Sequence, residues 1–237
     1  MNNRKVILED LGYLEYQKAL EIQKNIFDEI LNQKLSNRKL PEDKQIITQN
    51  HLLFVEHPHV YTIGKTGNMD NLLLRENLLE REGITLYKTD RGGDITYHGP
   101  GQIVGYPILN LDYFFTDLHK YLRFLEEVII KAISHYGLSG HRSKDGTGVW
   151  LDVDKPSTRK ICAIGIRSSR WTVMHGFALN ANTDLDFFRH IFPCGIRDRQ
   201  VTSLEKELGY KVDTEELKKN IISNAFAEVF KAEIIRK

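Results

Sequence analysis

Arg91-Gly92-Gly93-Asp94-Ile95-Thr96-Tyr97-His98-Gly99-Pro100-Gly101-Gln102, followed directly by Ile103-Val104-Gly105-Tyr106-Pro107-Ile108-Leu109, is the strongest structural signal in the chain. Residues 94–98 and 103–109 are rich in β-branched and aromatic side chains, which favour strands. The Gly-Pro-Gly sequence between them is typical of a turn. The stretch therefore predicts two strands joined by a glycine-rich turn, within a middle region dominated by sheet.

The composition of the same stretch is typical of a segment that lines a ligand-binding pocket. Glycines allow backbone and ligand to approach closely, and Tyr97 and His98 offer an aromatic surface and a proton carrier. A plain turn with a hydrogen-bonded histidine is the alternative, and these residues alone leave both open. A dinucleotide site is excluded because the spacing from Gly99 to Gly105 is one residue too long and a strand follows where a helix is required.

Hydrophobic periodicity extends this interpretation to the rest of the chain. A three-and-four spacing of apolar residues predicts helices over 13–35, 118–136 and 214–234, and Thr202 to Glu205 predicts a capping box before a shorter helix. We expect the strands at 51–55 and 60–63 to form a hairpin around His57-Pro58-His59. Without repeats or linkers, residues 1–237 are predicted to form one α/β domain with a mixed sheet flanked by helices. The remaining expected strands are 5–8, 84–87, 148–153, 160–166 and 174–180.

Composition restricts the class of protein. The chain has 237 residues, of which 41% are hydrophobic and 27% charged, as in soluble globular proteins, and no run approaches the roughly 18 apolar residues of a membrane span. The short apolar run near the N-terminus predicts no signal peptide, hence a cytoplasmic protein. A net charge of +1 argues against nucleic acid as a partner, although residues 155–199 hold eight basic and three acidic side chains. That segment is either an ordinary mixed surface or a docking site for acidic partners.

Two further patterns do not indicate a cofactor. Gly64-Lys65-Thr66 resembles the end of a phosphate-binding loop, but His59 stands where that loop needs a glycine. No Cys-x-x-Cys or His-Glu-x-x-His spacing occurs, and His57 and His59 are interpreted as polar groups of a loop. We therefore expect neither a metal nor another cofactor.

Lys160 and Cys194 are candidates for covalent chemistry. Cys194 lies between Pro193 and Gly195, which favours an exposed turn, whereas Cys162 lies within a strand and is expected to be buried. Lys160 opens the apolar strand, where its ammonium needs a partner. A neighbouring cation that lowers a thiol pKa by about two units converts the thiol mostly to thiolate at neutral pH. The spacing of 34 residues does not by itself bring the two side chains together.

Five motifs, taken together and in order, resemble the signature of lipoyl(octanoyl) transferases. They cover residues 57–64, 91–111, 159–167, 175–180 and 193–196, and the resemblance extends over about residues 50–205. It implies the fold of the biotin and lipoate protein ligase catalytic domains and the activity of an octanoyl-[acyl-carrier-protein]:protein N-octanoyltransferase. It also implies that Cys194 is the acyl-thioester nucleophile, and that Lys160 lowers its pKa and acts as acid and base. The substrate-binding residues that it implies are Arg91, Gly92, Gly93, Asp94, Ile95, Thr96, Tyr97, His98, Ala163, Ile164, Gly165, Gly176, Phe177 and Ala178.

The resemblance also predicts the partners and the course of the reaction. Octanoyl-acyl carrier protein would donate the acyl group in a ping-pong reaction without ATP, and backbone N–H groups near Cys194 or in the glycine-rich segment would hold the oxyanion. The acceptors would be lipoyl domains of 2-oxoacid dehydrogenases and the glycine cleavage H protein, with neither nucleic acid nor membrane as a partner, and a monomer is expected. The rival hypotheses are an ATP-dependent lipoate or biotin ligase on the same fold and a non-catalytic module that binds acyl carriers.

Overall fold

The main element of the structure is a mixed sheet. The computed structural model describes residues 3–74, 76–144, 146–192 and 200–237. The strand order is β12-β1-β2-β6-β10-β9-β8-β7, with β11 beside β9; β12, β1 and β2 are parallel, and the strands from β2 to β7 pair antiparallel. The strands are β1 (Lys5–Tyr13), β2 (Asn50–Glu56), β6 (Gln102–Asn110), β7 (His141–Ser143), β8 (Gly146–Leu151), β9 (Arg159–Ser169), β10 (Thr172–Asn180), β11 (Gln200–Val201) and β12 (Glu233–Arg236).

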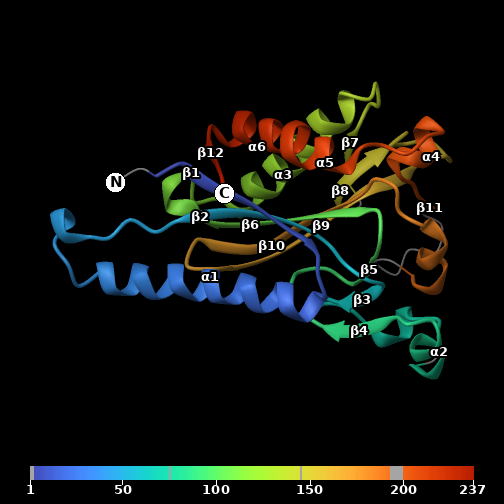
Figure 1. Cartoon of the computed structure of the whole chain (residues 1–237), viewed down its shortest axis with the longest axis horizontal. Coiled ribbons are helices and arrows are strands. Elements are labelled where there is room, and N and C mark those ends of the chain that lie inside the picture. The colour runs from blue at the N-terminus through green and yellow to red at the C-terminus, as the bar shows by residue number, and fades with distance from the viewer. Residues whose placement is uncertain (1–2, 75, 145, 193–199) are drawn as a thin grey trace.

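Helices cover both faces of this sheet (Figure 1). On one face α1 (Tyr16–Asn37) buries an apolar stripe that includes Phe27 against Leu53 and Met174. On the other face α3 (Leu118–Ser134) and α6 (Ser223–Phe230) pack into a second core. Each fully buried Leu, Ile or Phe contributes about 1.5 to 3 kcal/mol, so these two cores hold the layers together. The prediction of a mixed sheet flanked by helices is confirmed.

A second, smaller sheet lies beside the main one and corrects the predicted hairpin. Its order is β4-β3-β5, from β3 (Val60–Ile63), β4 (Thr85–Lys88) and β5 (Ile95–His98), with α2 (Glu76–Arg81) next to it. The strands β2 and β3 belong to different sheets and do not pair, so the hairpin prediction was wrong. The physical reason is His57, which is fully buried and hydrogen-bonds to Leu14 O and Tyr106 Oη, so the chain passes between the layers there.

The C-terminal helix was also predicted too long. It consists of α5 (Thr214–Glu216), a π-helical turn (Leu217–Ile222) and α6, and the chain then forms β12 along β1. Lys231 adopts a left-handed conformation with φ 51°, which ends α6. The pairing of β12 with the distant β1 is a non-local contact that helical periodicity does not reveal. No helix among the described residues is long and apolar enough to cross a membrane.

The predicted capping box is displaced by one residue. Ser203, and not Thr202, is the N-cap of α4 (Leu204–Leu208), where its side chain accepts the N–H of Lys206. The Thr202 hydroxyl instead donates to the carboxylate of Glu207. Asp117 caps α3 in the same way, by accepting the N–H of Lys120.

Candidate functional site

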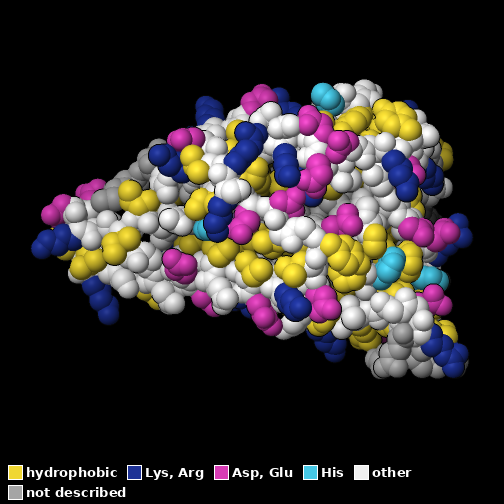
Figure 2. Space-filling view, viewed as in Figure 1, with side chains coloured by type: hydrophobic (Ala, Val, Ile, Leu, Met, Phe, Trp, Pro, Cys, Tyr) yellow, Lys and Arg dark blue, Asp and Glu magenta, His cyan; other side chains and the backbone are white. Residues whose placement is uncertain are grey.

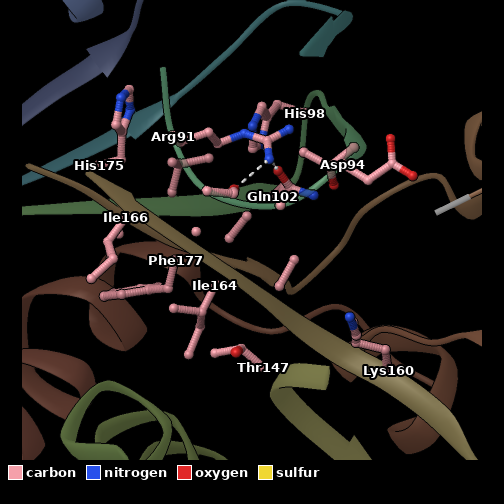
Figure 3. A pocket seen from close by; sticks show the side chains of 18 of the residues that line it. Arg91, Asp94, His98, Gln102, Thr147, Lys160, Ile164, Ile166, His175 and Phe177 are labelled. Atoms are coloured by element: carbon pink, nitrogen blue, oxygen red, sulfur yellow. Dashed lines mark hydrogen bonds between the residues drawn. The ribbon is translucent and has the colours of Figure 1, made fainter. Parts of the chain in front are cut away.

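A cavity of about 270 Å³ lies where β5, β6, β9 and β10 come together. Figure 3 shows part of its wall, with Lys160 and His175 far apart in the view and the side chains of Ile164 and Phe177 between them. Three sequence segments that are distant in the chain meet here, and almost all the predicted site residues line the cavity. Those residues are Arg91, Gly92, Gly93, Asp94, Ile95, Thr96, His98, Lys160, Ala163, Ile164, Gly165, Gly176, Phe177 and Ala178.

Tyr97 is the exception among the predicted substrate contacts within the described residues. Its side chain is fully buried, its hydroxyl bonds His59 Nδ1 at 2.8 Å, and its ring stacks on Phe187 at 5.0 Å between centroids. Adjacent side chains of a strand point to opposite faces, so His98 faces the cavity while Tyr97 faces the core of the small sheet. Tyr97 therefore packs against Phe187 and His59 and does not form part of the cavity wall.

His98 is held as a neutral imidazole. The Gln102 amide donates through Nε2 to Tyr97 O and Asn180 Oδ1, so its Oε1 faces His98 Nδ1 at 2.7 Å. This assigns the proton to Nδ1 and leaves Nε2 as an acceptor. Burial lowers the pKa of His98 to about 3, with the nearby His57 acting in the same direction. His98 thus presents an uncharged acceptor toward the cavity at neutral pH.

Arg91 connects the cavity to the small sheet. The residue is only 8% exposed, and its guanidinium donates to Thr62 O at 2.6 Å and to Gly92 O at 3.1 Å. A Cβ on Gly64 would lie 2.2 Å from Gly93 O, and Gly93 itself has φ 88°, so the two loops can pack this closely only as glycines. The Arg91 loop is therefore a rigid wall and not an open turn.

An ion cluster fastens the same loop to the main sheet. Asp90 accepts from His175 Nε2 at 2.8 Å and from Arg167 Nη1 at 2.5 Å, while Gly92 N–H donates to Ile166 O at 2.8 Å. The hydrogen bond from His175, followed by the charge of Arg167, lowers the pKa of Asp90 to about 2. His175 has φ 59°, an uncommon conformation for a residue that is not glycine. The cluster brings the 91–96 wall against β9 and β10.

Several of the residues that shape this region were not predicted as site residues. Asp90 immediately precedes the glycine-rich motif and His175 opens another motif, so their positions were the only signals in the sequence. Tyr16 and Tyr106 also line the cavity, although α1 and β6 supply them from outside the glycine-rich stretch 91–102. Helical and strand periodicity marks such residues as core, and only the packing of α1 on the sheet shows that they reach a cavity.

Lys160 lines the cavity from the N-terminal end of β9, where it is the second residue of the strand. Its carbonyl accepts the N–H of Thr202, and β11 pairs with β9 through Val201 opposite Lys160. The Lys160 ammonium lies 4.4 Å from the centre of the Trp150 ring. In Figure 3 its side chain points to the side of β9 where Arg91 and His98 lie. The lysine is therefore a positioned cation at the cavity.

The two cysteines differ in what can be said of them. Cys162 is fully buried, and desolvation raises the pKa of its thiol well above the ordinary value, which confirms that it acts as a small apolar residue. Cys194 and its motif at 193–196 lie outside the described residues. Among the described residues, no group of three or more His, Cys, Asp or Glu side chains is placed to hold a metal ion.

In the described part of the positive segment 155–199, several basic side chains are paired with acidic ones. Lys155 and Arg159 pair with Asp152, Arg159 also pairs with Glu207, and Arg167 pairs with Asp90. On the face seen in Figure 2, acidic and basic side chains are interspersed. These pairs favour the interpretation as an ordinary mixed surface over that of a cationic docking site.

Known proteins resemble this chain in sequence and in fold. The profile described as the lipoyl protein ligase A/B catalytic domain matches residues 15–226. The chain belongs to this family. It is 56% identical to the octanoyltransferase of Flavobacterium johnsoniae, over 98% of this chain and 100% of the relative, and 55% identical to that of Flavobacterium psychrophilum over the same shares. A bi-partite lipoate protein ligase from Thermoplasma acidophilum is similar in fold, with TM-score 0.69 over 100% of this chain and 87% of that chain at 16% identity.

These findings confirm the resemblance inferred from the five motifs. The catalytic-domain fold of the lipoate ligases is confirmed by the family match and by the similarity to the archaeal ligase. The prediction of an acyltransferase is confirmed by the curated relatives, which match nearly the whole chain at high identity. The cavity with Lys160 is accordingly the candidate active site of an acyl-transferring enzyme.

Proposed function

We propose that residues 1–237 act as one domain that transfers the octanoyl group of octanoyl-acyl carrier protein to a lysine of lipoyl domains. The observation that carries this proposal is the cavity, because its wall combines apolar side chains with Lys160, the one lysine among its described lining residues. Val104, Ile164, Ile166 and Phe177 supply the apolar lining. The relatives' shared name, octanoyltransferase, supports the same acyl group.

The size and lining of the cavity suit a medium-length acyl tail. At about 0.8 kcal/mol for each buried methylene, the roughly seven apolar carbons beyond the octanoyl carbonyl would contribute about 6 kcal/mol of binding free energy. Polar side chains such as Thr96 and Asn180 share the wall with these apolar ones, an arrangement in which polar groups can orient a mostly apolar ligand. Substrate selection would therefore rest on burial of the tail.

The proposed chemistry uses Cys194 and Lys160. The Cys194 thiolate attacks the thioester carbonyl, and the carrier thiol leaves with a proton from the Lys160 ammonium. The amine of the target lysine then attacks the acyl-enzyme, the neutral Lys160 takes the amine proton, and the Cys194 thiolate is released. Gln200 supports this assignment: it pairs with Arg159, next to Lys160, and the six residues from Cys194 to Gln200 span at most about 20 Å.

The backbone of the glycine-rich loop offers donors for the oxyanion. The N–H of Gly92 is donated to Ile166 O and that of Ile95 to the Asp94 carboxylate. Within the described residues, the N–H groups of Gly93 and Asp94 have no hydrogen-bond acceptor, and both residues line the cavity. We assign these two N–H groups as candidate donors to the tetrahedral intermediate.

The decisive experiment is intact-mass analysis of the protein mixed with octanoyl-acyl carrier protein in the absence of ATP. We expect an octanoyl adduct that hydroxylamine removes, that Cys194→Ser eliminates and that Cys162→Ser retains. Cys162→Ser is the matched control because it removes the buried thiol and keeps the other. An adduct that survives in Cys194→Ser would refute the nucleophile assignment.

A second arm of the experiment separates the transferase from an ATP-dependent ligase on the same fold. Free octanoate with ATP replaces the acyl carrier protein, and a lipoyl domain serves as acceptor. Transfer that requires ATP and shows no covalent adduct would identify the ligase. The glycine cleavage H protein and 2-oxoacid dehydrogenases are the expected acceptors, and offering each lipoyl domain in turn tests them. The expectation of a cytoplasmic monomer belongs to the same proposal and is tested by cell fractionation and by sedimentation.

A further inference from the structure

The Lys160 ammonium lies over an aromatic ring at the end of the cavity. The distance from Lys160 Nζ to the centre of the Trp150 ring is 4.4 Å, well within the roughly 6 Å range of cation–π attraction. Trp150 is only 3% exposed, so the ring is not a mobile surface group. Tryptophan is the aromatic residue that attracts a cation most strongly, and the attraction increases when water is excluded.

A bulge in β9 creates this contact. Gly148 and Val149 on β8 pair with Ala163 and Cys162, but the next pair is Trp150 with Lys160, so Ile161 is the extra residue. Uninterrupted pairing would place Ile161 opposite Trp150. Bulges of this kind redirect side chains beside functional sites. The bulge thus places the lysine directly across from the indole.

The strand β8 also holds the stem of the lysine. A Cβ on Gly148 would lie 3.5 Å from Lys160 Cε and only 2.5 Å from Cys162 O, so the glycine allows the stem to approach the strand. The N–H of Gly148 donates to the fully buried carboxylate of Glu126 at 3.1 Å, and Arg123 neutralises that carboxylate at 2.8 Å. Glu126 therefore fastens β8 to α3 behind the lysine. The position of Trp150 relative to Lys160 is built into the sheet.

We propose that Trp150 is a positioning residue that holds the Lys160 side chain at the cavity and favours its charged form. The proposal deepens the proposed function, because Lys160 is the acid and base of that reaction. An ammonium over the indole face is stabilised relative to the neutral amine, whereas an aliphatic side chain of similar size offers no such attraction. Removing the aromatic face should therefore make Lys160 lose its proton at lower pH and sample more orientations.

The first test is independent of activity. Trp150 and Trp171 are the only tryptophans in the chain, and Trp171 is 42% exposed in the β9–β10 turn, so Trp171→Phe leaves a single indole to observe. In this background the emission of Trp150 is expected to change with pH as the adjacent lysine loses its proton. The change should disappear in Lys160→Met, which keeps the length of the lysine stem up to Cε and removes the titrating nitrogen. An emission titration that is identical with and without Lys160 would overturn the proposal.

The second test measures the pH profile of octanoyl transfer in Trp150→Phe, Trp150→Tyr and Trp150→Leu. We expect the basic limb of the Trp150→Leu profile to move about 0.5 to 1 pH unit lower, with a fall in kcat and little change in KM. The aromatic variants should keep the wild-type position of the basic limb because each presents a ring to the ammonium, whereas a role in packing alone would lower the rate without moving that limb. Thermal unfolding of each variant identifies any that fail to fold.

The outcomes of the two tests separate the two proposals. A pH-dependent change in Trp150 emission that requires Lys160, together with a displaced basic limb in Trp150→Leu, supports the role of Trp150. Emission that follows Lys160 in a protein without transferase activity upholds the contact and overturns the proposed function. A basic limb that is the same in Trp150→Leu and Trp150→Phe, in folded active protein, overturns the role of Trp150 and leaves the proposed function standing.

Discussion

Two buried neutral histidines should make the protein sensitive to mild acid. Burial lowers the pKa of His57 from its ordinary value of 6.5 to about 4, and that of His98 to about 3. The folded state therefore binds fewer protons than the unfolded state between these values and pH 6.5, so stability falls as the pH decreases through that window. By contrast, Asp90, with a lowered pKa of about 2, contributes stability that is complete above its ordinary value of 3.8 and is lost only below it.

The magnitude follows from the shifts. One pKa unit corresponds to about 1.4 kcal/mol, so at pH 5 each histidine lowers the free energy of unfolding by about 2 kcal/mol relative to pH 7. The two together give about 4 kcal/mol, a large part of the typical total of about 5 to 15 kcal/mol. The pKa values of His51, His59 and His175 are also lowered by burial, so these histidines add to the loss, whereas Asp90 does not titrate in this range.

Urea unfolding of the wild type and of His57→Gln at pH 7, 6 and 5 measures this effect. His57→Gln should be less stable at pH 7, because His57 hydrogen-bonds to Leu14 O and Tyr106 Oη, but its loss between pH 7 and pH 5 should be about 2 kcal/mol smaller than that of the wild type. His119→Gln, on the exposed side of α3, is the matched control for removal of an imidazole. A wild-type stability that is constant from pH 7 to pH 5, or an equal slope in His57→Gln, would refute the reasoning.

Three further changes test the cavity. Lys160→Ala should reduce transfer by about 10² to 10⁴-fold, because it removes the acid and base, while urea unfolding stays near wild type; an unchanged rate would exclude Lys160 from the chemistry. Gly105→Ala places a Cβ 2.2 Å from the Phe177 ring. Urea unfolding should therefore show a loss of about 1 to 3 kcal/mol in the free energy of unfolding, and the KM for octanoyl-acyl carrier protein should rise. In Gly12→Ala the added Cβ would meet no atom within 4 Å while φ is 64°, so this variant measures backbone strain without a clash. Asp90→Asn should lower the free energy of unfolding by about 1 kcal/mol at pH 7, a modest value because the side chain is partly exposed and its ion pairs are screened. At pH 2 the loss should be nearly nothing. An equal loss at both pH values would contradict the stabilising role of the ion pairs of Asp90.

Local sequence patterns were sufficient for most individual elements. Alternating β-branched and aromatic residues marked β5, β6, β9 and β10, and the apolar stripe of α3 was correct because a helix that packs on a sheet must bury one face. The composition of the glycine-rich stretch indicated a ligand-binding wall, and the family resemblance added the motifs around Lys160 and Gly176; residues of all three motifs line the cavity.

The capping box was displaced by one residue, and the larger errors involve partners that are distant in sequence. Strand β2 pairs with β1 and β6 and not with β3, and β12 returns to β1 from the far end of the chain. The sequence of a short strand does not specify which strand it pairs with, since pairing depends on the whole arrangement of layers. The same reason explains why Tyr97, adjacent to His98, was placed on the wrong side of its strand.

The sequence by itself determined the class of fold, the family and the candidate lysine, because these depend on residue types at short spacing. Only the tertiary structure showed that Asp90 joins His175 and Arg167, that Gln102 sets the protonation of His98, and that a bulge places Lys160 over Trp150. Each of these relations joins side chains from different strands or loops. Their free energies depend on distance, burial and orientation, which chain folding creates and which no local pattern contains.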